Sequence, residues 1–363
     1  MTETVLHSFG IRGGPDGSAP VAGLTAVGGT LYGTTIYGGD RNMGDVGTVF
    51  SITTSGTYTQ LYIFSHAHTR NGGGYPWAGL TNLNGTLYGA TTGFGGGGGE
   101  GTIFKVTTSN KITLYRFMTA PDGSQPSADL TNVGGTLYGT TIFGGASTFG
   151  TVFAVTQSGR YRQLYSFTDA NDGCPVASLT NVSGVLYGTT SGCRKNNDGT
   201  VFKITTAGTE RVLHRFTGGG DGAVPEAGLT NVGGTLYGTT SAGGGTGCGG
   251  KGCGTVFKIT TAGTETVLYS FKGGRDGALP LAELTNVRGM LYGTTYWGGS
   301  SNNQGTVFKV TTLGKQTVLY RFAGEPDGES PYGGVVDVDG LLYGTTVNGG
   351  VNGNGTIFSL SGF

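Results

Sequence analysis

The tetrapeptide Leu-Tyr-Gly-Thr recurs seven times along this chain, if one copy that reads Leu-Tyr-Gly-Ala is included. The copies begin at Leu31, Leu87, Leu137, Leu186, Leu236, Leu291 and Leu342, so successive copies lie 56, 50, 49, 50, 55 and 51 residues apart. A period near fifty residues, with strand-forming residues inside each unit, is typical of a β-propeller or a related array. Seven such units account for all 363 residues. We therefore predict one all-β domain over residues 1–363, a seven-bladed β-propeller.

The unit that begins at Pro225 shows how each blade is expected to fold. Its four strands are predicted over residues 229–232, 235–240, 255–260 and 265–271. Val, Thr, Tyr, Phe and Ile fill these segments, as the pleated surface of a buried sheet prefers. A Gly-Gly pair joins the first two strands, and glycine supplies the positive φ that tight hairpin turns demand. Each blade is therefore expected to contain four antiparallel strands.

The two ends of the chain are expected to share the last blade. The chain begins with the fourth-strand pattern ETVLHSF and ends on the third-strand pattern GTIFSLSGF. We expect the N-terminal strand, residues 2–9, to pair with residues 356–360 and close the ring, which removes the exposed edges of an open sheet. A β-solenoid is the rival architecture, but a solenoid needs no split terminal repeat. In a ring the long loops emerge on one face, where repeat folds carry binding or catalysis.

The repeated elements GGTLYGTTxxGG, GTVFKIT, LYSF and DGxxP resemble the GloVer tandem repeat of bacterial secreted or surface proteins. The resemblance covers almost the whole chain. It implies an exported protein, often tethered by a separate C-terminal anchor, and it supplies no catalytic motif. The chain opens MTETVLHSFG, which has neither the basic start nor the apolar run of a signal peptide.

The charge balance excludes some classes of partner. Lys and Arg total 21, as do Asp and Glu, so no field of one sign attracts nucleic acid or an anionic membrane. No apolar run approaches the roughly 18 residues that a bilayer span requires. We therefore expect no nucleic-acid partner and no membrane insertion, and we expect a monomer.

The four cysteines indicate the compartment. Cys248 and Cys253 lie in one long loop of the fifth blade, whereas Cys174 precedes the fourth blade and Cys193 lies in that blade's own long loop. We predict two disulfides, Cys174–Cys193 and Cys248–Cys253, which favour an oxidising compartment and hence a secreted or cell-surface protein. A zinc site that joins both pairs is the alternative, although Cys-x4-Cys matches zinc spacing poorly. Four free thiols remain the third alternative.

An Asp-Gly-x-x-Pro segment, shortened to Asp-Gly-x-Pro before the fourth blade, enters six of the seven blades. Its aspartates favour a turn, because Asp bonds to its own downstream backbone and Gly takes positive φ. The alternative makes them calcium or sugar ligands, although no local acidic cluster supplies the six to eight oxygens that calcium wants. Calcium is the only cofactor these residues suggest, and we otherwise expect none. The six aspartates are Asp16, Asp122, Asp172, Asp221, Asp276 and Asp327.

The entry to the second blade departs from this rule and reads SHAHTRNGGGYPWAG. Folding alone does not require His66, His68, Arg70, Tyr75 and Trp77 there. His-x-His places two imidazoles on one side of an extended segment, as a metal half-site or an acid–base pair would need. The alternative is a tolerant exposed loop.

Two further sets of residues are expected on the long-loop face. The first lies at the start of the innermost strands and combines Trp77 and Tyr332 with the carboxylates Asp129, Glu226 and Glu283. Such a ring could hold a sugar by stacking and carboxylate bonds, and two carboxylates could serve as glycosidase acid and base; ordinary solvated rim charges are the alternative. The second set consists of aromatic residues that each precede a glycine, which suit sugar faces or packing between loops: Tyr37, Phe94, Phe143 and Trp297.

Three functional hypotheses follow from these patterns. The first is an extracellular binding propeller whose loop face recognises carbohydrate or a cell-surface partner. The second is a secreted polysaccharide-degrading enzyme, a glycoside hydrolase or a lyase, with its site at the channel mouth. Its catalytic residues would be His66, His68, Arg70, Asp129, Glu226 and Glu283. The third is a structural spacer in a surface protein, because propellers host all three roles.

Overall fold

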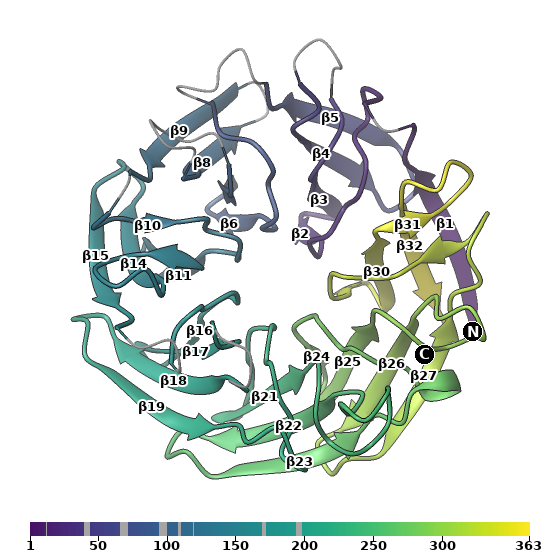
Figure 1. Ribbon diagram of the computed structural model, residues 1–363. Coiled ribbons are helices and arrows are strands. Elements are labelled where there is room, and N and C mark those ends of the chain that lie inside the picture. Colours follow the sequence, from purple (N-terminus) through teal and green to yellow (C-terminus); the bar gives the residue numbers. More distant parts are fainter. Residues whose placement is uncertain are drawn as a thin grey trace.

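The computed structural model describes residues 1–11, 13–39, 44–65, 72–93, 100–107, 110–118, 120–168, 172–193 and 198–363. Seven four-stranded antiparallel sheets surround a central channel, so the predicted seven-bladed β-propeller is confirmed (Figure 1). We number the blades in chain order, and the seventh blade contains both ends of the chain.

Each blade begins beside the channel with a short strand and ends at the rim. From the channel outwards, the first blade contains β2 (Thr25–Val27), β3 (Thr30–Thr35), β4 (Thr48–Thr53) and β5 (Tyr58–Ile63), the second contains β6 (Thr81–Leu83), β7 (Thr86–Thr91), β8 (Thr102–Thr107) and β9 (Asn110–Arg116), and the third contains β11 (Thr131–Val133), β12 (Thr136–Thr141), β14 (Thr151–Thr156) and β15 (Tyr161–Ser166). The fourth blade contains β16 (Thr180–Val182), β17 (Val185–Thr190), β18 (Thr200–Thr205) and β19 (Glu210–Arg215), and the fifth contains β20 (Thr230–Val232), β21 (Thr235–Thr240), β22 (Thr255–Thr260) and β23 (Glu265–Ser270). The sixth blade contains β24 (Thr285–Val287), β25 (Met290–Thr295), β26 (Thr306–Thr311) and β27 (Gln316–Arg321), and the seventh contains β29 (Val336–Val338), β30 (Leu341–Thr346), β32 (Thr356–Ser361) and β1 (Thr2–Ser8). The expected strand bounds in the fifth blade hold to within one residue.

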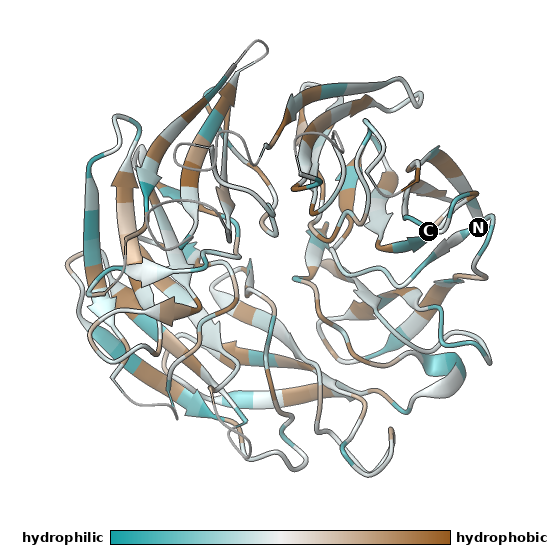
Figure 2. Cartoon of the chain, turned by 45° about the horizontal axis from the view of Figure 1, so that its top comes forward, coloured by the Kyte–Doolittle hydropathy of each residue, from teal (hydrophilic) through white to brown (hydrophobic). Residues whose placement is uncertain are grey.

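The glycine of the Leu-Tyr-Gly motif makes room for a phenylalanine of the neighbouring strand. A Cβ added at Gly238 would lie 2.6 Å from Cζ of Phe257 and 2.7 Å from Cδ2 of Leu229. In all seven blades the corresponding distance to the Phe Cζ lies between 2.5 and 2.7 Å. The leucine of the motif is buried, so the repeat that defines the sequence is the packing core of each blade. Figure 2 shows hydrophobic residues gathered on the strands and fewer of them on the connections.

Hydrogen bonds from threonine hydroxyls join neighbouring blades around the channel. Thr81 Oγ1 donates to the carbonyl of Leu130 in the next blade at 2.5 Å, and Thr34 Oγ1 donates to the carbonyl of Ala78 at 2.9 Å. The same bond from Thr345 to the carbonyl of Ala22 joins the last blade to the first, at 2.9 Å. These contacts fix the angular position of each blade, and hence of the residues that line the channel.

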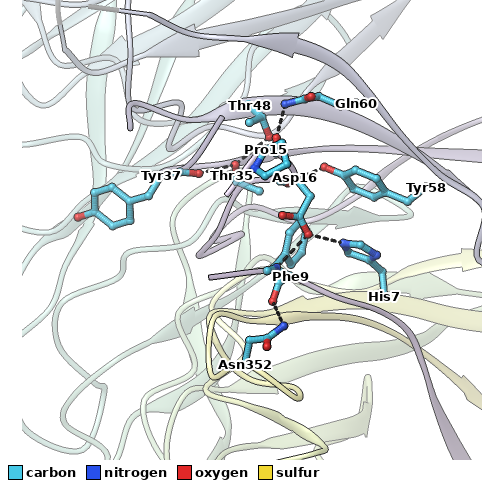
Figure 3. Close-up of polar contacts among 11 residues, drawn as sticks. His7, Phe9, Pro15, Asp16, Thr35, Tyr37, Thr48, Tyr58, Gln60 and Asn352 are labelled. Atoms are coloured by element: carbon cyan, nitrogen blue, oxygen red, sulfur yellow. Dashed lines mark hydrogen bonds and ion pairs between the residues drawn. The ribbon is translucent and has the colours of Figure 1, made fainter. Parts of the chain in front are cut away.

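The ring closes as the termini predict. β1 pairs antiparallel with β32, from Thr2 opposite Ser361 to Ser8 opposite Thr356. Beyond that pairing, Asn352 Nδ2 in the loop before β32 donates to the carbonyl of Phe9, the residue after β1, at 3.1 Å (Figure 3). The strand therefore ends at Ser8, one residue before the expected bound.

Two short β-ribbons and one 3-10 turn in the long loops were not expected from the sequence. β10 (Gly123–Ser124) pairs with β13 (Phe143–Gly144), β28 (Gly328–Glu329) pairs with β31 (Asn348–Gly349), and η3 (Gly274–Asp276) is a single 3-10 turn. Each of the two ribbons ties a blade-entry loop to the loop after the second strand of the same blade. Among the described residues there is no helix with the length and hydrophobicity that crossing a membrane requires.

Candidate functional site at the channel mouth

The residue after the blade-entry proline lies at the channel wall in every blade. The proline packs closely against a glycine of the preceding blade. In the fifth blade, Pro225 lies so near Gly199 that a Cβ added at Gly199, whose φ is +85°, would be only 2.6 Å from Cδ of Pro225. The chain then turns into the first strand, so the next side chain faces the channel. These seven residues line one cavity of about 420 Å³: Val21, Trp77, Ser127, Val176, Glu226, Leu281 and Tyr332.

A second cavity of about 310 Å³ adjoins the first on the long-loop side. It shares Trp77, Ser127, Val176, Glu226 and Tyr332 with the channel cavity. Thr92, Gln125 and Ile142 complete its wall. We call this second cavity, with the residues it shares, the channel-mouth site. It combines two aromatic side chains, one carboxylate, one amide and two hydroxyls, which is the mixture of apolar wall and few polar groups that small-ligand sites show.

Aromatic rings continue from the channel mouth onto the loop face. The rings of Trp77 and Tyr332 meet edge to face, with centroids 6.2 Å apart. Tyr332 meets Tyr296 at 6.0 Å, and Tyr296 meets Trp297 at 6.0 Å. We call these four residues the aromatic row. Trp77 and Trp297 at its two ends are 38% and 46% exposed, so the row offers ring surface to a ligand.

The carboxyl of Glu226 is the only charged group that the structure describes in the wall of the channel-mouth site. Burial raises the pKa of Glu226, and a hydrogen bond with Ser241 opposes that shift. Burial, followed by the charges of Glu226 and Tyr296, raises the pKa of Tyr332 to about 12. The Tyr332 hydroxyl therefore stays protonated at neutral pH and can donate a hydrogen bond.

A second layer of polar side chains lies deeper in the channel, two residues after the first ring. Ser178 Oγ donates to Oε2 of Glu283 at 2.9 Å, and the N–H of Gly79 donates to Oδ1 of Asp129 at 2.6 Å. The Glu283 side chain passes Gly228, where a Cβ would lie 2.6 Å from Oε2. Both side chains are exposed to the space of the channel, although the walls of the ring surround that space.

That enclosure acts on the two carboxyl groups. Burial raises the pKa of Glu283 to about 7; the hydrogen bond from Ser178 opposes the shift, and the charge of Asp129 adds to it. Burial also raises the pKa of Asp129, against the hydrogen bond from Gly79. The channel floor is therefore a pair of acids that interact through their charges.

The structure brings together the channel set that the sequence predicts. Trp77, Tyr332, Asp129, Glu226 and Glu283 all line the channel cavity. Sequence reasoning missed Tyr296, Gln125 and Ser178. Tyr296 was detectable, because it follows a Thr-Thr pair at a position that other repeats fill with small or aliphatic residues.

The other predicted aromatic residues are more scattered. Tyr37 and Tyr75 contact each other edge to face at 6.0 Å but line neither cavity. Phe143 lies in β13 and lines a separate cavity with Glu100 and Met118. Four predicted site residues lie outside the described residues: His66, His68, Arg70 and Phe94.

The aspartates of the blade-entry motif hold turns together. Asp276 accepts hydrogen bonds from the Tyr269 hydroxyl at 2.7 Å and the Lys272 N–H at 2.8 Å. In the first blade, Asp16 accepts from the Gly10 N–H at 2.9 Å, and its Oδ2 lies 3.2 Å from His7 Nε2 (Figure 3). Within the described ranges, no three His, Cys, Asp or Glu side chains lie close enough together to hold a metal ion.

Both predicted disulfides are present, Cys174–Cys193 and Cys248–Cys253. All four sulfurs are used, so the alternatives of a zinc site and of free thiols are wrong. Cys174 lies two residues before Val176 of the channel ring, and its carbonyl accepts from the Ser191 N–H at 3.1 Å. This disulfide thus anchors one blade entry at the channel mouth.

The sequence pattern of the Gloeobacter/Verrucomicrobia repeat matches residues 45–251 and 245–362. The chain belongs to the Gloeobacter/Verrucomicrobia repeat family. This confirms the resemblance drawn from the repeated motifs. No curated protein matches the chain.

Solved structures resemble this Gloeobacter/Verrucomicrobia repeat protein in fold. A puromycin-hydrolysing peptidase of Mycobacterium tuberculosis has a TM-score of 0.57 at 11% identity, and 93% of this chain aligns with 53% of that one. A putative 6-phosphogluconolactonase from Bacteroides uniformis has a TM-score of 0.53 at 13% identity, over 89% and 88% of the two chains. One of two prolyl endopeptidases has a TM-score of 0.51 at 11% identity, over 94% and 50%. The chain spans about half the length of both peptidases, and these identities support the shared fold alone.

Proposed function

We propose that this protein is an extracellular binding propeller whose channel-mouth site recognises carbohydrate. The observation that carries the proposal is the pair of aromatic rings from Trp77 and Tyr332, which contact each other and line a cavity of about 310 Å³. The C–H faces of a sugar ring are apolar and suit an aromatic wall, because aromatic side chains offer a large, rigid apolar surface. Glu226, Gln125 and the Tyr332 hydroxyl supply acceptors and donors for sugar hydroxyls.

The shape of the aromatic surface favours an oligosaccharide. The aromatic row extends beyond the cavity, from Trp77 through Tyr332 and Tyr296 to Trp297, with about 6 Å between successive ring centroids. One sugar unit in the cavity would leave the outer rings uncovered. A chain of several units would cover the row and bury more of its apolar area.

Export is part of the same proposal. Two disulfides join all four cysteines of the chain. Disulfides persist in oxidising compartments and are rare in reducing cytosol. A secreted or surface location would also expose the site to polysaccharides outside the cell.

A glycan array tests the proposal. The wild-type protein is expected to bind a defined set of oligosaccharides. Trp77→Ala is expected to abolish that binding, because it removes one wall of the cavity. Leu313→Ala is the matched control, since Leu313 is 90% exposed in the turn between β26 and β27 on the opposite face. Equal binding by Trp77→Ala and wild type would contradict a site at the channel mouth, and an empty array would favour a structural spacer.

A polysaccharide-degrading enzyme is the second candidate. The raised pKa of Glu283, about 7, suits a general acid, and Asp129 interacts with it in the same cavity. In a glycoside hydrolase Glu283 would protonate the leaving oxygen, while a second carboxylate acts as nucleophile or base. Chromatography of array-positive oligosaccharides after incubation tests this role. Product release that Glu283→Gln abolishes would support the enzyme, and intact oligosaccharide would leave binding alone.

A further inference from the structure

The charges around the channel are all of one sign. Asp129, Glu226 and Glu283 line the two cavities, and among the described wall residues none is Lys, Arg or His. The chain as a whole is balanced, with 21 basic and 21 acidic residues. The acidic channel is therefore a local feature and does not follow from composition. A cavity with low-dielectric walls and charges of one sign concentrates ligands of the opposite charge.

Glu226 has an environment that favours a cationic ligand. It lines the same cavity as the rings of Trp77 and Tyr332. Glu226 and Tyr332 line one cavity of about 310 Å³, so a single ligand there can contact both groups. Aromatic faces attract cations through the quadrupole of the ring, and a carboxylate adds direct attraction. An ammonium group placed there would meet both.

We propose that the channel-mouth site selects oligosaccharides that carry free amino groups, in which a protonated amine lies beside Glu226 and the sugar rings lie along the aromatic row. This inference rests on the proposed carbohydrate function and names its ligand class. The pyranose faces use Trp77 and Tyr332, and the ammonium group uses the carboxylate. Acetylation of the amine would remove the positive charge and the attraction to Glu226.

The deeper acids act in the same direction. Asp129 and Glu283 line the channel cavity together with Glu226 and add negative potential when ionised. Burial also raises the pKa of Glu226. An ammonium group beside Glu226 would favour the ionised carboxylate and lower that pKa.

Calorimetry with four soluble probes tests the inference in weakly acidic buffer, in which the amines of the probes carry protons. The probes are a glucosamine hexamer, the N-acetylglucosamine hexamer, a glucose hexamer and spermidine. The glucosamine hexamer is expected to bind about tenfold or more tightly than its acetylated counterpart, since a charged hydrogen bond is worth about that factor. Added salt should reduce this advantage, because it screens charge.

Two variants assign the preference to one carboxylate. Glu226→Gln keeps the shape of the side chain and removes its charge. This variant should therefore bind the glucosamine hexamer and the N-acetylglucosamine hexamer with equal affinity. Asp339→Asn is the control, because Asp339 is exposed in the turn between β29 and β30 on the opposite face. That control should keep the full preference. The comparison of hexamers on the wild-type protein needs neither variant, so it holds even if Glu226→Gln folds poorly.

The remaining outcomes separate this inference from the proposed function. Equal binding of the three hexamers by the wild type would overturn amine selection and leave carbohydrate recognition intact. Spermidine bound as tightly as the glucosamine hexamer would overturn both, because the site would then recognise an amine without a sugar. Binding of none of the probes would also overturn the amine preference.

Discussion

The hydroxyl of Ser178 in the fourth blade donates a 2.9 Å hydrogen bond to Oε2 of Glu283 in the sixth blade, across the backbone of Gly228 in the blade between them. Side chains two blades apart can meet because the intervening position carries no side chain. The deeper layer of the channel is thus specified by where the repeat has glycine as much as by where it has Asp, Ser or Glu.

Gly228→Ala should break this bridge. The new Cβ would lie 2.6 Å from Oε2 of Glu283, so the carboxylate must move away and lose its bond from Ser178. We expect the free energy of unfolding to fall by about 1 kcal/mol, the usual contribution of one hydrogen bond. Urea denaturation measures it. Gly220→Ala is the control, because no atom lies within 4 Å of a Cβ there and the residue is exposed. Equal stability of the two variants would contradict the bridge.

Gly238→Ala should cost more than Gly228→Ala. Its Cβ would meet Cζ of Phe257 at 2.6 Å and Cδ2 of Leu229 at 2.7 Å, inside a core that has no free volume to absorb it. Overpacking of this kind costs about 1–3 kcal/mol. Urea denaturation, with Gly220→Ala again as the control, should give Gly238→Ala the lowest free energy of unfolding of the three variants. A neutral effect would mean that the Leu-Tyr-Gly motif does not serve packing.

The sequence predicts the ring well because its determinants are local. The positive φ of Gly233 and Gly234, 59° and 85°, is the geometry that a two-residue hairpin requires, and it can be inferred from the residues alone. The disulfide pairs were predictable because Cys248 and Cys253 share one loop, whereas Cys174 and Cys193 lie in two loops that the propeller places on one face. The post-proline ring was predictable because every blade enters the channel in the same way.

The contacts between blades were not predictable to the same degree. The sequence places Asp129 and Glu283 in one layer, but it does not show that Glu283 reaches past Gly228 to Ser178. It also groups Phe143 with Trp297, because both precede a glycine. The structure separates them, since Phe143 lines another cavity together with Met118, while Trp297 belongs to the aromatic row. Whether the histidines of the second blade entry approach the channel stays a prediction, because they lie outside the described residues.

Stability should fall as the pH rises through the weakly acidic range. Burial and the charge of Asp221 raise the pKa of Glu265 to about 7, whereas an unfolded Glu titrates near 4.5. At pH values between about 4.5 and about 7 the folded chain binds more protons than the unfolded chain, so the free energy of unfolding decreases as the pH rises. Groups nearby are Asp221 and His214, whose Nε2 lies 3.4 Å from Asp221 Oδ2.

Glu265→Gln should flatten this part of the pH profile. The substitution suits the site, because Gln316 begins β27 as Glu265 begins β23. Urea denaturation at intervals from about pH 4.5 to 7 measures the slope for both proteins. An unchanged slope would show that Glu265 does not carry the effect.

The two disulfides should differ in their contribution to stability. Cys174–Cys193 closes a separation of 19 residues and Cys248–Cys253 one of 5, so the first restricts the unfolded chain more. The chain-entropy relation gives about 3 and about 2 kcal/mol. Each disulfide is removed by a double Cys→Ser substitution. The variant without Cys174–Cys193 should therefore unfold at a lower temperature than the variant without Cys248–Cys253. The reverse order would contradict this account, and alkylation of thiols in unreduced, denatured protein would contradict the pairing itself.

The most direct test of the channel-mouth site uses the chain's own fluorescence. Trp77 and Trp297 are the only two tryptophans. Trp297→Phe leaves Trp77 as the single reporter, and Phe suits the position because Phe143 occupies it in the third blade. Titration with the best array-positive oligosaccharide should change the Trp77 emission in a saturable way, with the dissociation constant that calorimetry gives. Binding by calorimetry without any change in Trp77 emission would place the ligand elsewhere and contradict the account.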